Sequence, residues 1–331
     1  MNFTTPVELP KKEFGITHRD SIMLAGSCFA SNIGSRLQER KFNIEVNPFG
    51  VLYNPLSIAA MLKRVAAGEP FSEASAEIFE HNGLWHSILH HGDFSRENKG
   101  DLLECINARV DKANVIAKEC DAVFVTFGTA YAYILNSSGT VAGNCHKLPG
   151  GMFTRRLLGI REIVSAMSEV IEIYRNLNKN VRFIFTVSPI RHLRDGAHDN
   201  QKSKSTLLLA IDEIMQLYPE NTHYFPAYEI VLDELRDYRY YADDMVHPSN
   251  TAIEYIWECF AKCYFNEETI AVCNDMEEIV RALNHRPFDA ASDGYRRFVE
   301  NLQHKIESIA AKYPYLDLKN EIMQCNTLLK K

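Results

Sequence analysis

Residues 21–30 read Ser-Ile-Met-Leu-Ala-Gly-Ser-Cys-Phe-Ala, and this stretch decides the fold. Its first five residues form a short apolar run, typical of a buried strand, which ends directly at Gly26. The stretch predicts a strand, a tight turn carrying Ser27 and Cys28, and then a helix, because glycine lets the backbone turn sharply. A nucleophile in such a turn is exposed at the edge of the sheet, where the helix N-terminus favours a developing anion. The same turn also occurs in α/β folds as plain structure, so it does not establish a function alone.

Further β-rich runs alternate with amphipathic helices along the chain. The runs are Phe42–Val46, Asp121–Thr126, Val181–Val187 and Thr222–Phe225, and the helical patterns cover residues 160–174, 207–218 and 253–264. This alternation predicts right-handed βαβ units and an α/β fold with a parallel sheet. In such sheets the ligand crevice lies beyond the carboxyl ends of the strands. The segments that follow the strands are therefore expected on one rim.

A second chemical motif lies near the end of the α/β region. Residues 243–249 read Asp-Asp-Met-Val-His-Pro-Ser and precede a helical pattern for which Ser249 is a suitable N-cap. A carboxylate three residues before a histidine can bond the imidazole and fix its tautomer, so that the ring acts as a general base. Asp244 and His247 are the candidates for this pair. Taken alone, the motif is better interpreted as a solvated helix entrance.

Composition excludes several classes of function. The chain has 331 residues, 46% of them hydrophobic, which is enough for one large domain with an extension. Its net charge of -7 argues against a nucleic-acid-binding surface. The apolar runs are too short to span a bilayer, and we expect no secretory signal. Eight cysteines in such a chain indicate reduced thiols and a cytoplasmic location, and we expect no cofactor.

The motifs, taken in order, resemble the GSCFA family, within the SGNH (GDSL-type) hydrolases. The resemblance covers about residues 20–265 and rests on the first motif together with 47–50, 127–129, 144–147, 188–189, 237–241 and the Asp244–His247 pair. It implies a three-layer α/β/α sandwich with a five-stranded parallel sheet. We expect residues 1–265 to form this domain and 266–331 to form a helical C-terminal extension.

The resemblance leaves the nucleophile open. In the usual Gly-Asp-Ser-Leu motif of SGNH enzymes the third residue attacks, and aligning the glycines places Cys28 there. A shifted register would use Ser27, and a third interpretation is that neither attacks. A thiol at a helix N-terminus beside His247 is expected to have a lowered pKa, which favours Cys28. The structural alternative to a nucleophilic role is that Cys28 is a small buried residue.

The oxyanion hole departs from the SGNH pattern. Those enzymes use the nucleophile's own N–H, a glycine after the second strand and an asparagine after the third. Gly50 matches the glycine, but Ala130 stands at the asparagine position. Asn144 or the Thr129 hydroxyl is a candidate substitute. Without one, the protein is expected to be a binder or a weak catalyst, because losing such a donor costs about 10²–10³ in rate.

Histidines provide the remaining candidates. His146, His192 and His90 are candidate substrate-binding residues, with structural roles as the alternative for each. Zinc binding by His86, His90 and Cys145 is a remote hypothesis, because the spacing needs further ligands, and we assign no metal.

The sequence thus predicts a hydrolase or acyltransferase for an ester, such as a small acyl group on a carbohydrate. The attacking residue is Cys28 or Ser27, with His247 as base and then acid. The alternative is a non-catalytic binding protein on the same scaffold.

Overall fold

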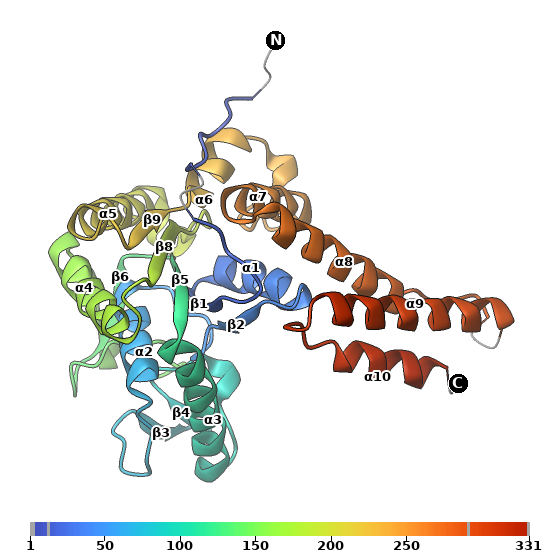
Figure 1. Ribbon diagram of the computed structural model, residues 1–331. Coiled ribbons are helices and arrows are strands. Elements are labelled where there is room, and N and C mark those ends of the chain that lie inside the picture. Colours follow the sequence, from blue (N-terminus) through green and yellow to red (C-terminus); the bar gives the residue numbers. More distant parts are fainter. Residues whose placement is uncertain (1–3, 12–13, 290–291, 330–331) are drawn as a thin grey trace. The chain divides into compact units, whose positions relative to one another are not determined.

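The computed structural model describes residues 4–11, 14–289 and 292–329 (Figure 1). The chain divides into two compact units. The first comprises the described residues of 1–11, 21–34 and 44–263, and the second comprises those of 12–20, 35–43 and 264–331. The C-terminal extension predicted from residue 266 is therefore joined in its unit by two earlier segments.

The first unit contains a five-stranded parallel sheet in the order β2-β1-β5-β8-β9. Its strands are β1 (Ser21–Gly26), β2 (Asn43–Val46), β5 (Cys120–Phe127), β8 (Arg182–Val187) and β9 (Thr222–Tyr224). The helices are α1 (Cys28–Glu39), α2 (Pro55–Ala67), α3 (Lys99–Lys118), α4 (Ile160–Leu177), α5 (Gly196–Leu217), α6 (Ala227–Glu229) and α7 (Asn250–Tyr264). The fold class is confirmed, and each strand lies within a residue or two of its predicted position.

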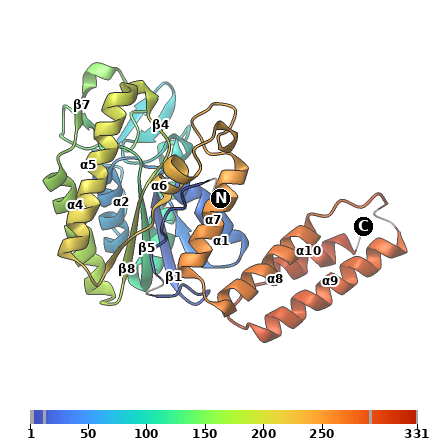
Figure 2. The ribbon, with the colours of Figure 1, turned by 90° about the horizontal axis from the view of Figure 1, so that it is seen from above.

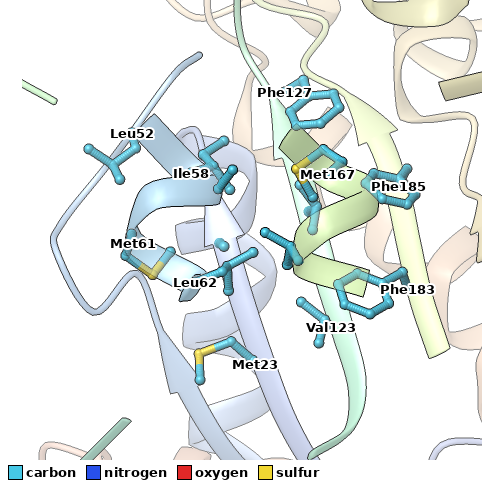
Figure 3. Close-up of a cluster of buried hydrophobic side chains, with 14 of the residues drawn as sticks. Met23, Leu52, Ile58, Met61, Leu62, Val123, Phe127, Met167, Phe183 and Phe185 are labelled. Atoms are coloured by element: carbon cyan, nitrogen blue, oxygen red, sulfur yellow. The ribbon is translucent and has the colours of Figure 1, made fainter. Parts of the chain in front are cut away.

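Helices cover both faces of the sheet (Figure 2). Helices α2–α5 lie on one face, where alternate strand residues such as Met23, Val123 and Phe183 join their apolar side chains in one core (Figure 3). Helices α1 and α7 lie on the other face, where Phe260 packs on Phe124 with ring centroids 5.2 Å apart. Because side chains alternate along a strand, a sheet buried on both faces reads as a continuous apolar run. This is why the strands could be located from the sequence.

Strand register brings the carboxyl ends of β1, β5 and β8 to one level. Gly26 pairs with Thr126, and Thr126 pairs with Thr186 in the next strand. The segments that begin at Ser27, Gly128 and Ser188 therefore leave the sheet side by side. This is the rim that the alternation of strands and helices predicted.

Two hairpins interrupt the α/β pattern. The first joins β3 (Ile78–His81) to β4 (Leu84–Ser87), and the second joins β6 (Tyr131–Leu135) to β7 (Phe153–Leu157). Asn82 and Gly83 form the turn of the first hairpin, with positive φ angles of 54° and 76°. The long connection between α2 and α3 thus has secondary structure of its own.

The second unit is mainly helical. Its helices are α8 (Glu267–Leu283), α9 (Asp293–Lys312) and α10 (Lys319–Leu328), around a core that includes Val272, Ile279 and Leu302. Ion pairs tie the earlier segments to these helices, such as Arg40 to Glu277 at 3.2 Å. Within the described residues, no helix is both long and apolar enough to cross a bilayer.

Candidate functional site

The turn after β1 can be made only by glycine. Gly26 has a φ of 133°, and a Cβ atom there would lie 2.1 Å from the carbonyl oxygen of Thr126. The Gly26 N–H donates to Asn47 Oδ1 at 2.8 Å. The turn is thus fixed between β5 on one side and the end of β2 on the other.

Ser27 and Cys28 lie in different environments, although they are adjacent. The Ser27 residue is only 1% exposed, and its Oγ has no hydrogen-bond partner among the described residues. Cys28 is partly exposed and is the first residue of α1. A helix leaves its first N–H groups without intrahelical partners, so the Cys28 N–H is directed away from the helix. The geometry favours Cys28 over Ser27 as the reactive side chain.

Asp244 holds the imidazole of His247. The His247 Nδ1–H donates to Asp244 Oδ2 at 2.5 Å, and the other carboxylate oxygen accepts the backbone N–H groups of Val246 and His247 at 2.9 Å. These bonds lower the pKa of Asp244 to about 2. The arrangement assigns the proton to Nδ1, which leaves Nε2 free to accept one.

One cleft of about 510 Å³ brings the two motifs together. Its walls include Ser27 and Cys28 from the first turn and His247 from the loop before α7. Segments that follow β5 and β8 complete the walls, as expected for the carboxyl edge of a parallel sheet.

The structure does not support Gly50 as an oxyanion donor. Its N–H donates to the carbonyl oxygen of Asn47 at 2.8 Å, and Gly50 is absent from the walls of the cleft. A positive φ of 78° and close approach to His91 explain the glycine instead, because a Cβ atom would lie 2.4 Å from the His91 Cβ. Gly50 therefore shapes the chain after β2.

Both candidate substitutes for the missing asparagine line the cleft. The Thr129 hydroxyl already shares a 3.0 Å hydrogen bond with Ser203 Oγ and accepts the Tyr131 N–H. Asn144 Oδ1 accepts the His146 N–H at 2.8 Å, which orients the side-chain amide. Within the described residues no hydrogen bond uses Asn144 Nδ2, so Asn144 is the better donor of the two.

Tyr53 is a cleft residue that the sequence interpretation missed. Its hydroxyl lies 4.0 Å from Cys28 Sγ. Burial, with the nearby thiol as a second cause, raises the pKa of Tyr53 to about 12, so the hydroxyl remains protonated and can donate. The available signal was its position shortly after β2, on the predicted rim.

Of the three histidines predicted to bind substrate, only His192 lines the cleft. Its ring packs edge-on against Tyr53, and burial lowers its pKa to about 4, so it is neutral. His90 is 0% exposed and stacks on Phe49 with ring centroids 4.0 Å apart. His146 is also buried, and its Nε2 donates to the Ser87 carbonyl oxygen at 2.8 Å.

The burial and contacts of His90 and His146 therefore favour structural roles for both over substrate binding. Both are held inside the layer formed by the first hairpin and its neighbours rather than at the cleft surface. The described residues contain no group of three or more His, Cys, Asp or Glu arranged to hold a metal ion.

A buried lysine lies beneath the rim. Lys204, on α5, is 0% exposed, and its amine donates to the carbonyl oxygens of Gly128 and Ser188, each at 2.6 Å. These carbonyls belong to the segments that follow β5 and β8. Burial, followed by the charge of Arg191, lowers the pKa of Lys204 to about 7. Lys204 thus ties together the two segments that carry Thr129 and His192.

Comparison with protein families identifies the chain. The model described as the GSCFA family matches residues 21–260, and the model described as the GSCFA domain protein, C-terminal domain, matches residues 276–331. A comparison with curated proteins finds no significant match. The first match covers most of the chain, so this protein belongs to the GSCFA family.

Proposed function

We propose that this member of the GSCFA family is an acyl hydrolase or acyltransferase that cleaves an ester through Cys28, His247 and Asp244. One observation carries the proposal: a partly exposed thiol at a helix N-terminus lines the same cleft as a histidine whose tautomer a carboxylate fixes. A nucleophile, a base and a group that orients the base are the requirements for acyl transfer. The order of these motifs and the three-layer sandwich support a relation to SGNH hydrolases.

In the first half-reaction, His247 Nε2 takes the thiol proton and Cys28 Sγ attacks the ester carbonyl carbon. A C–S bond forms, and the carbonyl electron pair moves to oxygen. When this intermediate collapses, the ester C–O bond breaks and His247 gives its proton to the leaving alkoxide. The product is an alcohol, and the acyl group remains on Cys28 as a thioester.

In the second half-reaction, His247 takes a proton from water or from an acceptor hydroxyl, whose oxygen attacks the thioester. The C–S bond breaks, and the sulfur regains its proton from His247. Thioesters pass acyl groups readily to alcohols, so transfer to a carbohydrate hydroxyl is compatible with the site. The walls of the cleft include Tyr53, Tyr131 and Tyr133, whose rings offer aromatic surface to such an acceptor.

The negative oxygen of the intermediate needs donors other than Gly50. We assign this role to the Cys28 N–H, the Tyr53 hydroxyl and Asn144 Nδ2. Tyr53 is the strongest side-chain candidate, because its hydroxyl lies within 4.0 Å of the attacking sulfur. These three donors come from different segments of the chain. We propose that they take the place of the usual SGNH oxyanion donors in the cleft, although Tyr53 and Asn144 do not match those donors in the sequence.

Trapping of the acyl intermediate tests the proposal. With 4-nitrophenyl acetate in rapid-mixing experiments, we expect a burst of nitrophenolate and an enzyme mass increased by one acetyl group on Cys28, removable by neutral hydroxylamine. The variant Cys28→Ala should show neither. Cys145→Ala is the matched control, since this partly exposed cysteine also lines the cleft and should be dispensable. An acetyl group on Ser27, or an undiminished burst in Cys28→Ala, would overturn the assignment.

A second candidate is a binding protein without catalytic activity. The use of the Gly50 N–H within its own turn favours it, because one expected oxyanion donor is missing. This function predicts no burst and no ester turnover that depends on Cys28 and His247.

A further inference from the structure

The cleft has a charge opposite to that of the chain. The protein carries a net charge of -7, yet three arginines and one aspartate are among the residues that line the cleft. The arginines are Arg155, Arg191 and Arg194, and the aspartate is Asp195. A cleft lined by one sign of charge concentrates ligands of the other sign.

Asp195 does not neutralise this group, because Arg155 already uses it. The Asp195 side chain is only 5% exposed and accepts a hydrogen bond from the Arg155 guanidinium. The same guanidinium lies 4.0 Å from the centroid of the Tyr131 ring. Arg155 and Asp195 thus form a paired, stacked unit in the wall of the cleft.

Arg191 and Arg194 lie on the segment between β8 and α5, and both are exposed. Among the described residues, neither has an ion pair or a hydrogen bond through its guanidinium. Arg194 nevertheless acts on the cleft, because its charge opposes the rise that burial causes in the pKa of the Cys145 thiol. The adjacent ring of His192 is neutral at physiological pH, so the positive charge of this segment comes from the two arginines.

We propose that Arg191 and Arg194 bind an anionic oxygen group, a carboxylate or a phosphate, on the ester substrate. The proposal rests on the function proposed above and adds a substrate class to it: an O-acylated molecule with an acidic group near the scissile ester. Guanidinium groups suit both anions, because their N–H donors match pairs of anionic oxygens. The segment that carries both arginines also begins at the carboxyl end of β8, the same edge of the sheet at which the turn that carries Cys28 leaves β1, with β5 between them.

Alkylation of Cys28 tests the anion site without any ester. Iodoacetate and iodoacetamide form the same C–S bond and release iodide, but only iodoacetate carries a carboxylate. We compare their rate constants at Cys28 by peptide mass spectrometry, at constant ionic strength, in the wild type and in the double variant Arg191→Gln/Arg194→Gln. The ratio of the iodoacetate rate to the iodoacetamide rate should fall about tenfold in the variant, the effect of about 1.4 kcal/mol of lost anion binding.

The matched control is Arg175→Gln. Arg175 lies in the last turn of α4, at the opposite end of the sheet from the cleft, and the substitution removes one guanidinium charge where the double variant removes two. Its alkylation ratio should equal that of the wild type. Thermal unfolding of each variant verifies that the fold is retained.

Competing anions distinguish the two ligand sources. Inorganic phosphate and benzoate are added separately during alkylation by iodoacetamide. Stronger protection by phosphate indicates a phosphorylated substrate, and stronger protection by benzoate indicates a carboxylated one. An unchanged ratio in the double variant, together with no protection by either anion, would overturn the proposal.

The outcomes separate this proposal from the proposed function. Alkylation requires only an accessible Cys28, so a charge-dependent ratio without any acetyl burst leaves the anion site standing and contradicts the ester chemistry. An acetyl burst together with an alkylation ratio that does not depend on the two arginines would support the ester chemistry and contradict the anion site.

Discussion

Four histidines of the α/β unit differ in what surrounds them: three are buried, and one, His247, lines the cleft. Three of them, His86, His90 and His146, are buried by the first hairpin and its neighbours, and at least one ring nitrogen of each contacts a backbone carbonyl or a serine hydroxyl. His247 has a half-exposed side chain, lines the cleft and is paired with a carboxylate. All four residue positions looked plausible for chemistry in the sequence.

A carboxylate partner and access to solvent therefore distinguish the proposed catalytic histidine from the structural ones. Burial lowers the pKa of His90 to about 3, so its ring stays neutral and serves packing. His247 keeps one nitrogen bonded to Asp244 and one free. If this contrast is correct, substitution of His247 should affect activity, and substitution of the buried histidines should affect stability.

The largest expected effect is that of His247→Ala. Removing the base should lower kcat/KM for 4-nitrophenyl acetate about 10⁴–10⁶-fold, because thiol activation and leaving-group protonation both depend on the ring. Steady-state hydrolysis measures it, with added imidazole as a test of rescue. His198→Ala is the control, since this exposed histidine of α5 is not part of the cleft wall. Retained activity in His247→Ala would remove the contrast.

Asp244→Asn should have the next largest effect. It keeps the shape of the side chain but loses the charge that fixes the Nδ1–H tautomer, so kcat should fall about 10²–10⁴-fold. Because the pKa of Asp244 is about 2, the carboxylate is ionised throughout the range from pH 5 to 9, so its own titration should not appear in the pH–rate profile of the wild type over that range. Asp243→Asn, which changes the adjacent exposed aspartate, should leave the rate unchanged.

His90→Ala should act on stability instead. Loss of a fully buried ring that stacks on Phe49 should lower the free energy of unfolding by about 2–4 kcal/mol, measured by urea denaturation. The activity of the folded fraction should not change. His91→Ala, at a half-buried neighbour, should cost less than about 1 kcal/mol.

The comparison of His90→Ala with the wild type also makes a prediction about the pH dependence of stability. The folded-state pKa of His90, about 3, lies below the unfolded value near 6.5, so the unfolded state binds the extra proton as pH falls. This group should therefore cost the wild type about 2 kcal/mol between pH 7 and pH 5. The free energy of unfolding lost between pH 7 and pH 5 should be smaller in His90→Ala by that amount. Equal pH dependence in both proteins would contradict the buried, neutral state of His90.

The smallest expected effect is that of Ser27→Ala. The hydroxyl is buried and has no hydrogen-bond partner among the described residues, so its loss should change kcat/KM less than about threefold. A loss as large as that of Cys28→Ala would instead make Ser27 the nucleophile, and would require the turn to open.

The sequence predicted the parts of the molecule that local patterns determine. The five strands are apolar runs with clear ends, and the bond between Asp244 and His247 lies within one short loop. The bond from the Gly50 N–H to Asn47 could not be predicted, because it depends on how the chain folds back after β2. Tyr53 and Arg194 were missed because only the meeting of separate loops places them in the cleft. His90 looked accessible because its burial depends on packing against rings distant in the sequence.

Lys204 links the integrity of the rim to that of α5. Its amine joins segments that follow β5 and β8, but the lysine itself belongs to α5, which comes after both strands in the chain. The two carbonyl oxygens therefore acquire their donor only when the whole β5–α4–β8–α5 segment is folded. Amide hydrogens of this rim should consequently exchange with solvent in the same cooperative step as those in the centre of the sheet, although most loops exchange by local fraying.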